Sequence, residues 1–363
     1  MADKTVTVNT DNSGSPTYTT LNAAFSGEDG AEFDAYTEVL YINCSGATDD
    51  PGAANTGSSF GSCSETHYIC VTGNNTTGIY NANYYHIYKN LTVSGSYNGI
   101  LVSSTTKNCR FYNIQIHLAG NSAVVDTYTG ISFNDVSNVN NAYVVNCIIK
   151  STFTGNANSH RGIGTYDSYG PWYFYNNILH GFNGTDANGK GIGGNYGTFY
   201  IYNNTIVNCT YGVHRSGGTF NLINDVFSGC TNDAYSTISD TYCATTNDNT
   251  KGLTALGTGN RFSVTCNFVS TSDFHLTSSS TDLINYGSDL SATFTTDIDG
   301  TTRPTGAGTW DIGADEYVAA GGNATIVLKY RTGATSALCE AATYQEYTVP
   351  FDSEGFVQLR VEG

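Results

Sequence analysis

Two stretches of sequence, 27 residues apart, decide the fold: Trp172–His180 reads WYFYNNILH and Phe199–Val207 reads FYIYNNTIV. Each has aromatic and apolar residues in alternation, then two asparagines, then a second apolar run. Alternation with a period of two is typical of a β-strand. An asparagine between two such runs indicates a tight corner, because asparagine tolerates left-handed backbone geometry. The repetition predicts a strand–corner–strand unit that recurs along the chain.

The same pattern continues in both directions. With the second asparagine of each pair as the reference, the corner positions are Asn90, Asn113, Asn146, Asn177, Asn204 and Asp225. Successive positions are 23, 33, 31, 27 and 21 residues apart. A unit of this length with short strands cannot bury its apolar side alone, so neighbouring units must stack. Stacked amides can also hydrogen-bond along their column. The chain is therefore predicted to be an all-β, parallel β-helix with a structural ladder at these six positions.

The composition supports an all-β chain and excludes some partners. The 363 residues include 41 glycines and 27 tyrosines but one methionine and 14 lysines plus arginines, so strong helix formers are scarce. The net charge of -17 argues against binding to nucleic acids or anionic membranes. No apolar run reaches the roughly 18 residues that a membrane helix needs, and the first residues lack the apolar segment of a signal peptide.

Parts of the sequence resemble the pectin-lyase-like right-handed parallel β-helix superfamily. Residues 6–25 (VTVNTDNSGSPTYTTLNAAF) resemble its opening strand, turn and short capping helix. Residues 273–289 and 297–317 resemble the segment that closes many of its members. The resemblance implies a single right-handed solenoid with an N-terminal capping helix over residues 1–318. It implies little about activity, because one fold supports many functions.

The pattern changes after the sequence ADEYVAAGGNA. Residues 319–363 contain three strand-like runs and are predicted to form a small, separate β-sandwich-like module. This tail resembles modules of bacteriophage structural proteins. The resemblance implies a role in attachment to a larger virion or surface assembly, or in oligomerisation.

Three successive units are lengthened at one corner. The distance from each corner position to the next Gly-Ile or Gly-Val pair is 9, 17, 16, 14 and 8 residues. The insertions lie in residues 117–130, 151–162 and 180–191, and in a solenoid they line up on one face. The residues predicted to contact glycans there are His160, Arg161, His180, Lys190, Tyr128, Tyr169 and Trp172. The candidate catalytic carboxylates are Asp126, Asp167 and Asp186. The plainer interpretation is that these are solvated loop residues.

The sequence predicts no metal site and no cofactor, with calcium as the one exception to test. Asp297–Gly300 and Asp311–Glu316 are rich in carboxylates, but the ligand spacing of a calcium-binding EF-hand loop is missing. Aspartate beside glycine in a turn explains both segments. The ten cysteines lack zinc-site spacing; Cys63 and Cys70 are candidates for a disulfide, and the others are predicted to be core residues.

These observations favour a structural or receptor-binding surface protein. The expected type is a bacteriophage appendage, decoration or tail-spike-like rod that contacts polysaccharide. It is expected on a virion or extracellular surface and is expected to assemble as a homotrimer. One alternative is a polysaccharide lyase or glycoside hydrolase acting at the lengthened loops. The motifs of pectinesterases, pectate lyases and polygalacturonases are missing from the sequence, which weakens that alternative. A second alternative is a bacterial surface adhesin.

Overall fold

The computed structural model forms two compact units, Met1–Glu316 and Tyr317–Gly363. The residues it describes are 4–9, 16–28, 39–45, 54–55, 68–72, 75–76, 79–80, 86–89, 92–95, 98–103, 109–118, 127–134, 141–153, 159–166, 170–183, 188–255, 257–306, 310–319, 325–330 and 345–350.

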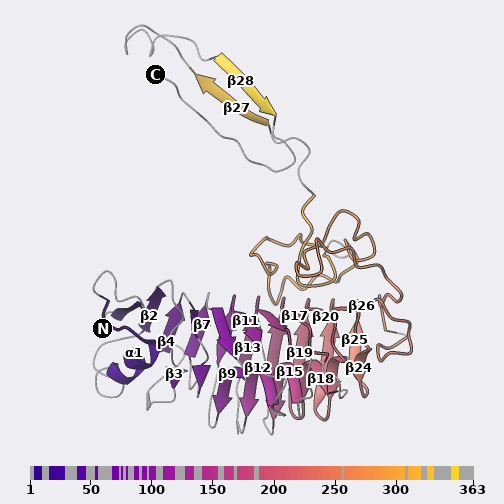
Figure 1. The fold of residues 1–363 in the computed structure, drawn as a ribbon. Coiled ribbons are helices and arrows are strands. Elements are labelled where there is room, and N and C mark those ends of the chain that lie inside the picture. The colour runs from indigo at the N-terminus through magenta and orange to yellow at the C-terminus, as the bar shows by residue number, and fades with distance from the viewer. Residues whose placement is uncertain are drawn as a thin grey trace. The chain divides into compact units, whose positions relative to one another are not determined.

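The first unit consists of three parallel sheets whose strands are stacked in register (Figure 1). Sheet A has ten strands: β1 (Lys4–Asn9), β2 (Val39–Ser45), β4 (Tyr68–Thr72), β7 (His86–Lys89), β10 (Arg110–Tyr112), β13 (Ala142–Val145), β16 (Trp172–Tyr175), β19 (Thr198–Tyr202), β22 (Thr219–Ile223) and β25 (Ser239–Thr241). Sheet B has eight: β5 (Asn75–Thr76), β8 (Thr92–Gly95), β11 (Gln115–Leu118), β14 (Ile148–Ser151), β17 (Ile178–His180), β20 (Thr205–Val207), β23 (Val226–Ser228) and β26 (Ala244–Thr245). Sheet C has eight: β3 (Ala54–Asn55), β6 (Ile79–Tyr80), β9 (Asn98–Ser103), β12 (Thr127–Asn134), β15 (Ser159–Tyr166), β18 (Gly189–Gly194), β21 (Tyr211–Arg215) and β24 (Asn232–Tyr235). From β7 to β26 the chain visits sheets A, B and C in turn, so each circuit adds one strand to every sheet. The predicted all-β class with stacked parallel strands is confirmed.

Alternating residues of each strand build the interior. In sheet A, Phe111, Val144, Phe174, Ile201 and Leu222 occupy equivalent positions in five successive coils and are buried. Because side chains alternate across a strand, the residues on either side of them face outward. The alternation seen in WYFY and FYIY is therefore the pattern of a sheet with one buried face.

At the corner between sheets A and B, the residue that turns the chain differs by one position from the predicted residue in three coils. The left-handed residues are Asn113, Asn146, Asn176, Asn203 and Asn224, with φ between 52° and 60°. Asn113 and Asn146 were predicted correctly as corner residues. In the coils with two adjacent polar residues, the first one turns the corner, and Asn177, Asn204 and Asp225 follow it. Asn90 lies outside the described residues.

The second residue of each pair forms a buried ladder. Asn177 Oδ1 accepts a hydrogen bond from the Cys147 amide at 2.9 Å. Asn204 Oδ1 accepts from the Asn177 backbone amide at 3.0 Å and from Asn177 Nδ2 at 2.9 Å. Asp225 Oδ1 accepts from the same two groups of Asn204, at 2.8 and 2.9 Å. The expected column of hydrogen-bonded side chains is thus confirmed for Asn177, Asn204 and Asp225.

Asp225 is the weak member of this ladder, and its replacement by asparagine is expected to stabilise the protein. Its Oδ2 is buried without a hydrogen-bond partner among the described residues, and burial raises the pKa of the carboxyl well above its usual value, although hydrogen bonds from Asn204 oppose the shift. A pKa raised by folding means that stability present at low pH is lost as the pH rises above the unfolded-state pKa. We expect Asp225→Asn to raise the free energy of unfolding at pH 7 by about 1–3 kcal/mol, with a smaller gain near pH 4.

Urea unfolding of both proteins across this pH range checks the prediction. Asp248→Asn is the control: this exposed carboxylate accepts hydrogen bonds from Thr250 that lower its pKa, so its replacement should not raise stability at pH 7. Equal stability of the Asp225→Asn variant and the natural protein at pH 7 would contradict the argument.

The first residue of each pair has a different role: its side chain holds the segment that follows the last coil. Asn176 Nδ2 donates to the Thr296 carbonyl at 2.7 Å, and Asn224 Nδ2 donates to the Ser288 carbonyl at 2.8 Å. Asn203 Nδ2 donates to the carbonyls of Asp311 and Gly313. Described residues between 261 and 316 therefore return along the A–B corner of the stack.

Arg303 anchors this returning segment. Its buried guanidinium contacts Glu316 Oε2 at 2.7 Å and donates to Asn176 Oδ1 at 3.2 Å. It also donates to the carbonyls of Gly313 and Ala314, at 3.0 and 2.9 Å. The segment whose sequence resembles a closing segment is thus held to the stack by a buried polar network.

The N-terminal helix α1 (Leu21–Gly27) covers part of the apolar core. It begins after Thr20, whose side chain accepts a hydrogen bond from the Ala23 amide at 3.1 Å. Leu21 and Phe25 are buried in the same cluster as Val8 of β1. None of the helices in the described residues is long and apolar enough to cross a membrane.

The second unit and the cysteines complete the description. In the second unit, β27 (Thr325–Tyr330) pairs antiparallel with β28 (Gln345–Pro350). Cys70 is buried, and Cys63 lies outside the described residues, so the disulfide between them stays a prediction. Five further cysteines are buried core residues, as predicted: Cys109, Cys147, Cys209, Cys230 and Cys243.

Candidate functional site

The outer face of sheet C brings together two of the predicted residues, Arg161 and Lys190. They occupy equivalent positions on β15 and β18, and the same column continues to Thr129 on one side and Tyr211 on the other. Neighbouring strands of a sheet lie about 4.8 Å apart. The two cationic residues are therefore adjacent on one strip of the surface.

Two glycines allow Arg161 to lie flat on the sheet. Gly164 and Gly193 are equivalent outward positions of β15 and β18. A Cβ on either glycine would lie 3.1 Å from Arg161 Cδ. The guanidinium carbon of Arg161 instead lies 4.1 Å from the centre of the Tyr166 ring, in a cation–π contact.

An aromatic group continues the strip. His214 and Tyr235 follow Gly193 in the same column, and their rings stack with centres 4.4 Å apart and planes within 6°. The Tyr211 ring meets both edge-on. Tyr235 is 50% exposed, so it presents aromatic surface to solvent.

Arg161 and Lys190 place two cationic side chains on this strip, although the whole chain carries a net charge of -17. Burial, and then the positive charges of Lys190 and Arg161, lower the pKa of His214 to about 4. Lys190 is 8% exposed, and burial lowers the pKa of Arg161. Charges in such partly buried positions interact more strongly with an anion than charges in open water.

The Gly-Ile and Gly-Val pairs noted in the sequence lie in the strands of sheet C. A Cβ on Gly130, Gly162 or Gly191 would lie 2.6–2.7 Å from a backbone oxygen of the next coil. Only glycine fits where the backbones approach so closely. The pairs therefore lie within the sheet C strands, directly after the column that holds Arg161 and Lys190.

Four of the predicted glycan-contacting residues are buried. Lys190 lies on the outward side of its strand, whereas the other three point into the core, which corrects their assignment. Tyr128 and Trp172 are 0% exposed, and neither ring offers an open face to a sugar. Tyr128 stacks on Phe153, and Trp172 Nε1 donates to the Tyr196 carbonyl at 3.2 Å. His160 is also buried, with Nε2 2.7 Å from Ser151 Oγ. Their strand positions point inward; for Trp172, the alternation with the buried Phe174 is the signal that could have shown this.

Of the remaining predicted residues, the structure describes only His180, and it does not join this strip. His180 lies on the outward face of sheet B, on β17, where its ring contacts Phe274. Asp126, Asp167, Asp186 and Tyr169 lie outside the described residues, so their predicted roles stay predictions. The features of the strip that the sequence reasoning missed are the aromatic group around Tyr235 and the outward glycines.

One group of described side chains has an arrangement that could hold a metal ion. Ligand atoms of His275, Asp299 and Asp315 lie within 4.8 Å of one another. His275 also makes ion pairs with Asp273 and, at 2.8 Å, with Asp299. Burial lowers the pKa of His275, but its hydrogen bond to Asp273 and the charges of the nearby carboxylates outweigh burial and leave the pKa raised. A protonated histidine between carboxylates accounts for this arrangement without an ion.

The comparisons with known proteins add no relative from which a role could be transferred. The function is therefore inferred from the side chains of sheet C. No family model, curated protein or solved structure matches the chain.

Proposed function

We propose that this protein is a structural surface protein that binds acidic glycans along the outer face of sheet C. The observation that carries the proposal is the alignment of Arg161 and Lys190 on adjacent strands. Arginine and lysine are the usual partners of carboxylate and sulfate groups. Two such residues one strand apart suit a polymer that carries an anionic group on successive sugars.

The aromatic end of the strip supports a saccharide in particular. The exposed ring of Tyr235 provides an apolar surface against which the C–H face of a sugar can pack. His214, which has a lowered pKa, is neutral at pH 7 and can exchange hydrogen bonds with hydroxyl groups. Tyr235 thus takes the role that the sequence suggested for Tyr128 and Trp172.

The finer class and location are part of the same proposal. We place the chain among right-handed pectin-lyase-like β-helices, because parallel crossover connections are almost always right-handed and the sequence resembles both ends of that fold. The sequence of residues 319–363 supports a bacteriophage or other surface assembly. A homotrimer would cover outward tyrosines of sheet A such as Tyr143, Tyr173 and Tyr200, and sedimentation equilibrium tests it.

Binding of polysaccharides to a single-lysine variant tests the glycan site. We expect the protein to bind polygalacturonate or heparin but not dextran, with affinity that falls as salt is added. Lys190→Met keeps the apolar stem and removes the charge, and should weaken binding about tenfold or more, since a charged hydrogen bond contributes roughly 1.5–3 kcal/mol. Isothermal titration calorimetry measures the change.

Lys150→Met is the matched control, because Lys150 is exposed on β14 of sheet B and lies away from the strip on sheet C. It should bind as the natural protein does. Thermal unfolding of both variants shows whether the fold is intact. Unchanged binding by a folded Lys190→Met variant would contradict the proposal.

A further inference from the structure

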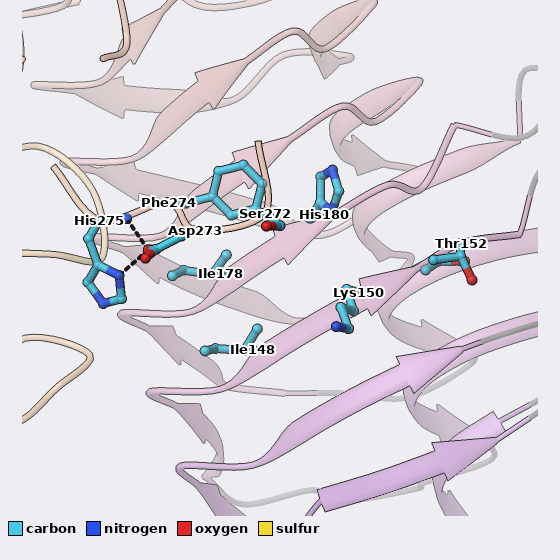
Figure 2. Close-up of a pocket in the computed structure, with 10 residues that line it drawn as sticks. Ile148, Lys150, Thr152, Ile178, His180, Ser272, Asp273, Phe274 and His275 are labelled. Carbon is cyan, nitrogen blue, oxygen red and sulfur yellow. Dashed lines mark hydrogen bonds and ion pairs between the residues drawn. The ribbon is translucent and has the colours of Figure 1, made fainter. Parts of the chain in front are cut away.

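A pocket on the outer face of sheet B lies apart from the strip on sheet C (Figure 2). Its cavity volume is about 360 Å³. One wall is formed by β14 and β17, and the other by residues 272–275 of the returning segment. The pocket therefore exists only because the segment after the last coil folds back along the stack.

The surface of the pocket is mostly apolar. Ile148 and Ile178, which occupy equivalent positions on β14 and β17, contribute from the sheet. Phe274 contributes from the opposite wall and is almost fully buried. Ile178 and Phe274 belong to one apolar cluster, against which Ile148 packs. An apolar surface of this size suits the hydrocarbon or aromatic body of a small molecule.

A single lysine supplies positive charge at one end of the pocket. Lys150 lies between His117 and His180 in one column of sheet B. No ion pair joins Lys150 to a carboxylate in the part of the chain that the structure describes. Burial, and then the charge of Lys150, lower the pKa of both histidines, so they are neutral at pH 7 and can take part in hydrogen bonds. Thr152 adds a hydroxyl group near Lys150 (Figure 2).

The one carboxylate that lines the pocket, Asp273, is engaged elsewhere. It accepts hydrogen bonds from the ring Nδ1 and the backbone amide of His275. In Figure 2 these two residues lie together, away from Lys150 and Thr152. The lysine charge is thus separated from the acidic end by the apolar surface.

We propose that this pocket binds a small carboxylate with an apolar body, such as an aromatic or short aliphatic acid. The carboxylate contacts Lys150 and the Thr152 hydroxyl, and the body packs between Ile148, Ile178 and Phe274. The ligand and the face of the molecule both differ from those of the glycan site. The site goes beyond the proposed function and does not depend on it.

Saturation-transfer NMR and calorimetry with cinnamate, hexanoate and cinnamyl alcohol test the pocket. We expect the full chain to bind at least one of the two acids, and to bind the neutral alcohol about tenfold more weakly than cinnamate if cinnamate binds. Lys150→Met should lose this preference for the acid, because it removes the positive charge. The variant should stay folded, because Lys150 is exposed and methionine keeps its apolar stem. Lys190→Met, on sheet C, is the control and should bind the acids normally.

A second variant keeps the test decisive. Ser272→Trp places a large side chain at the exposed edge of the pocket and should abolish binding without disturbing the core. Failure of both acids to bind the natural protein would overturn the proposal. Equal binding of acid and alcohol, or unchanged binding by Lys150→Met, would overturn the assigned role of the charge.

Discussion

Replacement of Asn204 by alanine is expected to lower the free energy of unfolding by about 3–5 kcal/mol, because two or three buried polar groups lose their partners at roughly 1–3 kcal/mol each. Asn204 is fully buried at the centre of the ladder. Its Oδ1 accepts from two groups of Asn177, and its Nδ2 donates to Asp225 and to the Phe174 carbonyl. Alanine replaces none of these bonds and leaves a cavity.

Chemical unfolding followed by circular dichroism measures this loss. Asn134→Ala is the matched control: Asn134 is exposed at the end of a sheet C strand, and its replacement should change stability by less than about 0.5 kcal/mol. A loss below about 1 kcal/mol for Asn204→Ala would mean that neighbouring groups or water replace the missing amide. The ladder would then contribute little to the stability of the stack.

Replacement of Arg303 by methionine is expected to cost about 3–5 kcal/mol, the usual effect of removing one partner from a buried ion pair. The guanidinium is buried and contacts Glu316, Asn176 and two backbone carbonyls. Methionine fills a similar volume but leaves Glu316 buried without its cationic partner. The returning segment should therefore detach from the A–B corner at a lower denaturant concentration.

The cost should depend on pH in a defined direction. Burial raises the pKa of Glu316 to about 7 even beside Arg303. Without the arginine this pKa rises further. When a carboxyl has a folded-state pKa above its unfolded-state pKa, the free energy of unfolding of the protein falls as the pH rises above the unfolded-state pKa. Arg303→Met should thus be more destabilising at pH 8 than at pH 5.

Two comparisons sharpen the test of Arg303. Arg261→Met removes a more exposed ion pair, with Asp282 at 3.2 Å, and a cation–π contact with Tyr286, and should cost less than Arg303→Met. The double variant Arg303→Met, Glu316→Gln removes the unpaired charge and should recover part of the loss. A cost for Arg303→Met that is the same at pH 5 and pH 8 would contradict the role given to Glu316.

Much of the architecture could be predicted from the sequence because it depends on local patterns of residues. Alternation in Trp172–Tyr175 and Thr198–Tyr202 indicated strands, and their repetition indicated stacking. The asparagine pairs indicated both the corner and the ladder. Their two roles were assigned only by the structure, since either residue of a pair can adopt left-handed geometry.

The functional surfaces were less predictable. Arg161 and Lys190 were identified, because they lie in the lengthened segments, which were expected to line up on one face. Tyr128 and Trp172 were expected on the surface but are buried. For Trp172, alternation with Phe174 could have shown this. For Tyr128, the alternation is interrupted at Gly130, since Tyr128 and Ile131 both point inward although they are three positions apart.

The sequence by itself determined the repeating unit, the parallel stacking and the polar ladder, because each depends on residues within one or two coils. The tertiary structure decided what covers the A–B corner and where pockets form. Contacts such as that between Asn176 and Arg303 join residues 127 positions apart. They depend on how the segment after the last coil folds back, and the repeat pattern of the sequence does not predict that path. The pocket around Lys150 and Phe274 is a consequence of that return, which is why only the folded molecule reveals it.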